Sequence, residues 1–170
     1  LAPLWRSAEV RAFYFVLAGS VVLIAGYLVL FGGYTDPLLA LRHTVFHVVS
    51  IATTTGYATH DYATWPLFAP LHIILLGCFA TCAGSTGGGI KMVRMLLLLK
   101  QSRRELVRIV HPNVVNPVVL GGAAVSDRVM QSVIAYMMMY GATLVGLTMA
   151  LLFTGLDVVT AFTAVIACVN

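Results

Sequence analysis

The run Thr53-Thr54-Thr55-Gly56 is the first segment of this sequence whose residue types suggest chemistry. β-Branched threonines followed by glycine fit a helix poorly, so we expect an extended stretch of backbone. Carbonyl oxygens that neither helix nor sheet uses can replace the hydration shell of a cation, and glycine lets successive carbonyls face one axis. The absence of Asp and Glu favours a monovalent ion. The run predicts a cation filter with the ion on the carbonyls of Thr54 and Thr55; the alternative is a purely structural loop.

A glycine-rich run at residues 84–89 is the second such segment. Four glycines in six residues cannot form a stable helix, and irregular backbone inside a membrane is tolerated only where it lines a cavity. Just beneath a filter, such a loop would obstruct the path or move aside. Lys91 follows this run. Its ammonium either lies near the path and pairs with a loop carbonyl, or it snorkels to the membrane interface. The predicted gating loop comprises Gly84, Ser85, Thr86, Gly87, Gly88 and Gly89, with Lys91 beside it.

The overall composition shows what surrounds these two runs. Of the 170 residues, 60% are hydrophobic and 9% are charged, and the mean hydropathy is +0.96. Soluble domains are about 45–50% apolar and roughly 25% charged, so this chain is a membrane protein. Its length allows about four or five membrane-depth segments and leaves no room within it for a large extramembrane domain.

The hydrophobic pattern predicts an all-α polytopic membrane protein. Residues 10–33 suit a spanning helix, whereas the segment 36–52 is too short and too polar to cross and reads as a re-entrant helix, with Asp36 as N-cap and Pro37 in the first turn. Further spans are predicted at residues 64–82 and 129–153, a basic amphipathic helix at 90–110, and a last short apolar segment up to Asn170.

An internal repeat organises these elements. Tyr34-Thr35-Asp36 leads through Phe46 to the threonine run, as Gly155-Leu156-Asp157 leads through Phe162 to Cys168-Val169-Asn170. The unit consists of a span, a re-entrant pore helix, a filter loop and a second span, as in potassium channels. One unit cannot enclose a path alone, so several must surround an axis. The chain divides into a complete unit over 1–110, a linker over 111–127, and the truncated start of the next unit over 128–170.

The charges predict the orientation. Basic residues precede the first span and gather between the second and third, while the opposite loops carry only acidic ones, which predicts a cytoplasmic N-terminus and a cytoplasmic basic loop over 91–128. This asymmetry explains the net charge of +4, and no aromatic residues interleave with the basic ones as in nucleic-acid binding. The basic residues at these two places are Arg6, Arg11, Lys91, Arg94, Lys100, Arg103, Arg104, Arg108 and Arg128, and the acidic residues of the opposite loops are Asp36, Asp61 and Asp157.

Other chemistries fit less well. Three cysteines in apolar runs make neither a disulfide framework nor a zinc site, and His43 and His47 lack a third ligand, so no cofactor is expected. Gly89-Ile90-Lys91-Met92 departs from a phosphate-binding loop. An intramembrane serine hydrolase using Ser85 would need a base, and His72 and His111 are poorly placed for it. That reading and a non-conducting structural membrane fragment remain the alternatives.

Three blocks in order carry a resemblance to a known family. They are residues 50–57, residues 82–91, and the stretch with Leu96 to Lys100, Arg104-Glu105-Leu106 and His111-Pro112. The chain resembles the TrkH members of the Trk/Ktr/HKT superfamily of potassium transporters. The resemblance implies four non-identical units around one pore, of which this chain is the third and the start of the fourth. It implies a potassium filter lined by Thr53, Thr54, Thr55 and Gly56, with Val169 and Asn170 entering the fourth filter, and a gating loop at the glycine run.

The resemblance also implies partners and a location. It implies potassium transport by a channel or symport mechanism in the bacterial inner membrane, a homodimer of the full-length subunit, and a cytoplasmic nucleotide-binding ring like TrkA. Arg103, Arg104 and Arg108 would dock that ring, although positive-inside topology explains them equally well. Lacking two units, the rest of the fourth filter and the last inner helix, these residues alone could not conduct.

Overall fold

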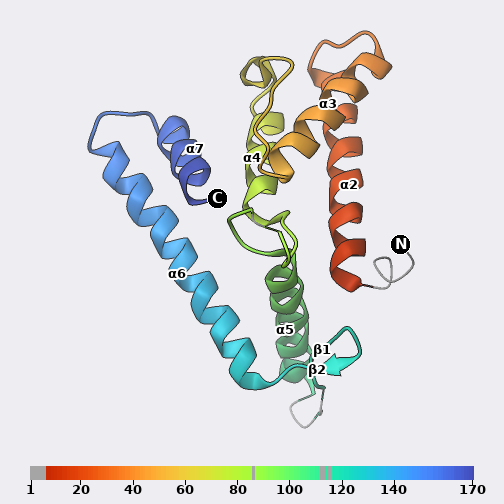
Figure 1. The fold of residues 1–170 in the computed structure, drawn as a ribbon, viewed down its shortest axis with the longest axis vertical. Coiled ribbons are helices and arrows are strands. Elements are labelled where there is room, and N and C mark those ends of the chain that lie inside the picture. The colour runs from red at the N-terminus through yellow and green to blue at the C-terminus, as the bar shows by residue number, and fades with distance from the viewer. Residues whose placement is uncertain (1–6, 86, 112–113, 115) are drawn as a thin grey trace.

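The computed structural model describes residues 7–85, 87–111, 114 and 116–170, so Arg6, Thr86 and Pro112 lie outside the described residues. The described part is mainly helical (Figure 1). In chain order its elements are α2 (Ala8–Phe31), α3 (Pro37–Ala52), the 3-10 turn η1 (Tyr62–Thr64), α4 (Phe68–Phe79), α5 (Met92–Val110), β1 (Val119–Leu120), β2 (Ala123–Ala124), α6 (Asp127–Leu152) and α7 (Val158–Val169).

Two helices, α2 and α6, are long and apolar enough by length and composition to cross a membrane. Their outward side chains include exposed Phe15, Leu30, Met138 and Met149, which suit contact with lipid rather than water. The inner face of α2 packs on α3 and α4 in a buried apolar core. These two helices match the first and third predicted spans.

The span predicted over residues 64–82 is wrong as a single helix. Helix α4 has 12 residues, which at about 1.5 Å per residue is much shorter than a bilayer core of about 30 Å. It ends early because the chain folds back on it: the carbonyl of Cys78 accepts from Ile90 N at 2.7 Å, and that of Thr81 from Met92 N at 2.7 Å. Helix α5 then continues beyond the break, below α4 in Figure 1.

The predicted linker contains a small β-hairpin. Strands β1 and β2 pair antiparallel across Gly121 and Gly122, whose φ angles of 60° and 89° suit a tight two-residue turn that glycine adopts without strain. Val118, just before β1, packs with Leu97 of α5 and with Met130 of α6. The hairpin thereby fills the angle between α5 and α6, and it is a small exception in an otherwise α-helical chain.

The order of long helix, loop and short helix occurs twice. Figure 1 shows α2 and α6 rising to loops at the same end of the molecule, after which α3 and α7 descend toward its middle. Both short helices begin at an aspartate, as predicted: Asp36 Oδ1 accepts from Leu38 N at 2.9 Å and Asp157 Oδ2 from Thr160 N at 3.0 Å. Both therefore point their C-terminal ends at the break between α4 and α5.

Candidate functional site

The threonine run makes a tight turn at the end of α3. The amides of Thr55 and Gly56 both donate to the Ser50 carbonyl, at 2.8 and 3.2 Å, and Thr54 N donates to Ile51 O at 3.0 Å. Thr54 and Gly56 have positive φ angles, 56° and 79°. The extended conformation predicted for the run is therefore wrong at its start, because the last carbonyls of α3 lack helical donors and take these amides instead.

The carbonyls of the run have no hydrogen-bonding partner in the part of the chain that the structure describes. No hydrogen bond among the described residues ends on the carbonyl oxygens of Thr54, Thr55 or Gly56. The next carbonyl along, that of Tyr57, is used, since it accepts from Ser50 Oγ at 2.6 Å. Three successive backbone oxygens are thus available to a ligand.

Fully buried His47 joins α3 to the chain that follows the turn. Its Nδ1 lies 2.8 Å from the carbonyl of His43, one turn earlier in α3, and its Nε2 lies 2.9 Å from the carbonyl of His60. The ring is packed edge-on against Tyr62 and Trp65. This arrangement ties the chain beyond the run back to α3, with both ring nitrogens of His47 facing backbone carbonyls.

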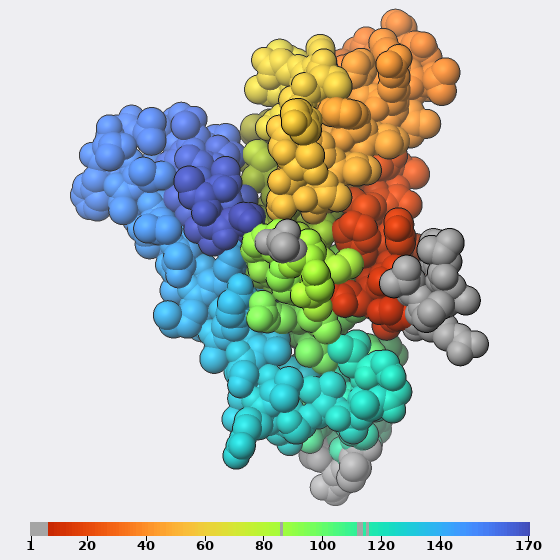
Figure 2. Space-filling view, viewed as in Figure 1, coloured from red at the N-terminus to blue at the C-terminus, as the bar shows by residue number. Residues whose placement is uncertain are grey.

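Both units face one cavity of about 1010 Å³. The first unit contributes the threonine run and one face of α4, and the second contributes α7 (Figure 2 shows α7, in dark blue, beside the middle of the molecule). Its polar lining includes Thr54, Gly56, Gly87, Thr160, Thr163 and Asn170. Thr54 and Gly56 of the threonine run and Gly87 of the glycine loop therefore border the same space.

The glycine run folds back beneath the threonine run. Gly87 lies beside Thr54, because a Cβ added there would come 3.1 Å from Thr54 Oγ1. Lys91 Nζ donates to the carbonyls of Ser85, at 2.8 Å, and of Gly87. Of the two interpretations of Lys91, the structure therefore shows pairing with loop carbonyls.

Glycine is required at two positions where the loop meets the second unit. Gly88 N donates to Asn170 O at 2.9 Å, and a Cβ at Gly88 would overlap that carbonyl. Gly89 has φ +76°, and a Cβ there would lie 2.5 Å from both Asn170 Oδ1 and Cys78 O. Gly84 has open space around it. The close approach between the units explains the glycines at the end of the run and leaves the first one unexplained.

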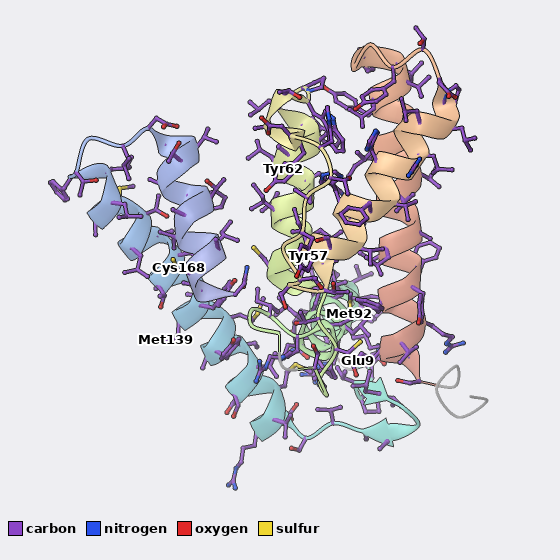
Figure 3. The ribbon with its side chains drawn as sticks, turned by 45° about the horizontal axis from the view of Figure 1, so that its top comes forward. Glu9, Tyr57, Tyr62, Met92, Met139 and Cys168 are labelled. Carbon is purple, nitrogen blue, oxygen red and sulfur yellow. The ribbon has the colours of Figure 1, made fainter. Side chains whose placement is uncertain are left out.

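Val169 and Asn170 occupy different environments. Val169 is the last residue of α7 and Asn170 its C-cap, so Val169 is helical and only Asn170 lies past the helix. Tyr140 Oη of α6 donates to Asn170 Oδ1 at 2.8 Å, and Asn170 Nδ2 lies 3.6 Å from Cys78 Sγ (Figure 3 shows this end of the chain near the labelled Cys168).

Three contact residues were missed by the sequence analysis. Tyr140 and Cys78 hold Asn170, and a carboxylate oxygen of Glu9, at the start of α2, accepts from Ala83 N in the loop (Figure 3 labels Glu9). Two sequence signals could have pointed to these contacts: the hydroxyl of Tyr140 within the apolar span 129–153, and the acidic Glu9 at the head of the first span. Cys78 offered none beyond its small size.

The hydrolase alternative receives no support from the geometry. Ser85 Oγ accepts from Gly87 N at 3.2 Å, and no hydrogen bond joins it to a histidine among the described residues. His72 Nε2 is instead 3.1 Å from Ser20 Oγ on α2, and His111 caps the far end of α5. Within the same described ranges, no group of three His, Cys, Asp or Glu residues could hold a metal ion.

Taken together, the fold and site define a class of membrane protein. A long apolar helix precedes an aspartate-capped short helix, this pair occurs twice around one cavity, and the complete unit ends in a helix broken by glycines. Non-helical backbone borders that cavity, as expected of ion-conducting proteins built from re-entrant helices.

Comparison with known proteins identifies the family. The family model TrkH, described as a cation transport protein, matches residues 3–170, and the chain belongs to this family of transporters. It is 39% identical over 166 residues to the Trk system potassium uptake protein TrkH of Escherichia coli K12, covering 98% of this chain and 34% of the relative. It is 37% identical to TrkG of the same organism over 170 residues, covering 100% and 35%.

A solved structure agrees with the fold. The crystal structure of the potassium transporter TrkH from Vibrio parahaemolyticus matches with a TM-score of 0.90 at 39% identity, covering 96% of this chain and 35% of that one. The resemblance seen in the sequence is thereby confirmed, as is the helical membrane fold. The chain spans about a third of the length of the curated relatives it matches.

Proposed function

We propose that the protein carries potassium across the membrane, and that Thr53, Thr54, Thr55 and Gly56 form one part of its filter. The observation that carries this proposal is the set of free carbonyls at Thr54, Thr55 and Gly56 beside a cavity that both units line. Carbonyl oxygens suit a monovalent cation, and the C-terminal end of α3 adds partial negative charge there. Relatives with about 39% identity are named potassium uptake proteins.

The chain supplies part of a larger pore in this proposal. Residues 1–110 form the third of four units, 111–127 the linker, and 128–170 the start of the fourth, with Asn170 at the entrance to its filter and Val169 just before it. The share of the relatives that the chain covers, about a third, supports this division. The remaining carbonyls around the ion come from the other units.

The glycine loop is the proposed gate. Gly84, Ser85, Gly87, Gly88 and Gly89 lie in the loop, which borders the cavity beside Thr54. Backbone hydrogen bonds to the ends of α4 and α7 and the Lys91 ammonium hold it there. Thr86 belongs to the same proposal, although it lies outside the described residues. Conduction then requires the loop to leave the path.

Orientation and partners complete the proposal. The N-terminus and the basic segment 91–128 face the cytoplasm of a bacterial cell and the threonine run faces outward, as the distribution of Arg and Lys indicates. The full-length subunit is a homodimer in the inner membrane, and a nucleotide-binding ring like TrkA regulates it from the cytoplasmic side. The curated relatives belong to Trk systems, which supports a partner of this kind.

The test is rubidium flux into liposomes that contain the full-length protein, with sodium as competitor. Gly56→Ser should abolish the preference for rubidium over sodium, because the side chain strains the positive φ at a filter carbonyl. Gly33→Ser is the matched control: Gly33 also has positive φ and open space, but it lies after α2, away from the cavity lining. Unchanged selectivity in Gly56→Ser would refute the filter, and absence of flux in the wild type would favour a non-conducting structural role.

A further inference from the structure

A basic groove lies at the end of the molecule away from α3. Its volume is about 400 Å³, and Figure 1 shows the elements around it, the lower end of α5 and the β1–β2 hairpin, close to the start of α6. None of its described lining residues is acidic. The lining consists of Lys100, Arg103, Arg104, Val107, Asn116, Pro117, Val118 and Val119. We propose that this groove binds the phosphate of an anionic membrane lipid.

Two of the three cations are held in place by the fold. Lys100 Nζ donates to the Val119 carbonyl at 2.6 Å, which fixes the ammonium against the hairpin. The guanidinium of Arg104 contacts Asp127 Oδ1 at 3.3 Å, and its side chain is only 11% exposed. Its Nε is buried and makes no hydrogen bond among the described residues, although it lies 3.5 Å from Glu105 Oε1 as an ion pair. Positioned donors of this kind need little reordering when an anion binds.

The third cation is available to a ligand. Arg103 is exposed, and it has no hydrogen bond or ion pair with any residue that the structure describes. The neighbouring Arg108 differs, since it pairs with Glu105 at 3.5 Å and does not line the groove. A planar guanidinium binds phosphate oxygens through two parallel hydrogen bonds, so Arg103 is the residue that would close on the anion.

Apolar side chains beside Arg103 favour a lipid over free phosphate. Leu99, Leu106 and Val110 are 60%, 65% and 69% exposed. Leu99 is four residues before Arg103, and Leu106 and Val110 are three and seven residues after it, so all four share one face of α5. A soluble anion gains nothing from that stripe, whereas acyl chains would cover it while the headgroup phosphate sits in the groove. This inference rests on the membrane placement of the chain and is independent of the ion path.

The experiment measures lipid binding to the detergent-purified full-length protein by native mass spectrometry. Phosphatidylglycerol and phosphatidylcholine with the same acyl chains serve as probes. The wild type should prefer phosphatidylglycerol, and Arg103→Gln should reduce its binding about fivefold, the effect typical of one basic side chain at an anionic surface. Arg108→Gln, with the same change of charge on the same helix, should retain the preference. Thermal unfolding and rubidium flux of each variant show separately that it is folded and conducts.

Four results would overturn the proposal. Equal binding of the two lipids, or phosphatidylglycerol binding unchanged in both Arg103→Gln and Lys100→Gln, would mean that the groove does not recognise the headgroup. Displacement of phosphatidylglycerol by an equal concentration of inorganic phosphate would assign the groove to a soluble anion. Loss of association with a nucleotide-binding ring in Arg103→Gln, with lipid binding intact, would assign it to a protein partner.

Discussion

Replacing Gly89 by alanine tests whether the glycine loop closes the path. Gly89 has φ +76°, and its added Cβ would lie 2.5 Å from Cys78 O and 2.5 Å from Asn170 Oδ1. Cβ atoms do not approach oxygen that closely, so the loop must shift away from the ends of α4 and α7. Because the folded-back arrangement depends on this contact, the substitution acts on the closed loop and leaves the core of α2, α3 and α4 untouched.

The size of the effect follows from two terms. A left-handed backbone at alanine costs about 1–2 kcal/mol. A shift of the loop also breaks the hydrogen bond from Ile90 N to Cys78 O, 2.7 Å long, which contributes about 1 kcal/mol. The closed arrangement therefore loses about 2–3 kcal/mol, and its equilibrium with a displaced loop changes by about 30- to 150-fold.

Basal rubidium flux in liposomes is the assay, and two alanine variants calibrate it. Gly84→Ala adds the same methyl group to the same loop, but into open space and at an ordinary φ, so it should raise flux far less than Gly89→Ala. Gly146→Ala, on α6 with nothing near its Cβ, should leave flux unchanged. If Gly84→Ala and Gly89→Ala raised flux equally, or neither raised it, the loop would not be the closed gate.

Three further predictions follow from single side chains. Lys91→Met removes the ammonium that binds two loop carbonyls, so basal rubidium flux should rise; wild-type flux would show that this contact does not hold the gate. His47→Phe removes the ring contact to the His60 carbonyl, while the His43 carbonyl keeps its helical partner, so the free energy of unfolding should fall by about 1 kcal/mol. Thermal melting measures this against exposed His111→Phe as control, and equal melting temperatures would contradict it. The hydrogen bond from Thr160 lowers the pKa of Asp157, so its stabilisation of α7 is full above the ordinary pKa of about 3.9 and is lost as pH falls through the lowered folded value. The hydrogen-exchange protection factors of α7 amides, which are corrected for the intrinsic rate at each pH, should fall in acid in the wild type and fall less in Asp157→Asn; identical acid responses would refute the role of the cap.

The features that sequence analysis found depend on neighbours in the chain. Asp36 and Asp157 cap their helices through amides two and three residues away. The cap at Asp36 was predicted, and the repeat predicted an aspartate at the start of the second short helix. The turn at Thr53 was not predicted. The β-branched residues there disfavour a helix, but they do not distinguish an extended strand from a turn that returns to Ser50. The Gly121-Gly122 pair indicated a turn, but two-residue strands are too short to show alternation.

The features that sequence analysis missed are contacts between distant segments. Asn170 meets Tyr140 across 30 residues and Cys78 across 92. No local pattern specifies either pair, because each partner is a single polar or weakly polar group in an apolar segment. The repeat placed the second unit beside the first only in outline. Which atoms meet depends on the packing of α7 against α4.

The fold-back of the loop answers a problem that the membrane imposes on α4. A helix that stops after 12 residues leaves its last carbonyls without partners, and inside a bilayer each unpaired group costs several kcal/mol. Here the returning chain supplies donors: Ile90 N reaches Cys78 O at the end of α4, and Met92 N reaches the carbonyl of Thr81 just past the helix. The same hydrogen bonds that make the break tolerable hold the loop beside the threonine run. Any displacement of the loop that moved Ile90 and Met92 would expose those carbonyls, so these hydrogen bonds favour the closed loop, and a substitution that breaks the bond from Ile90 to Cys78 favours the displaced one.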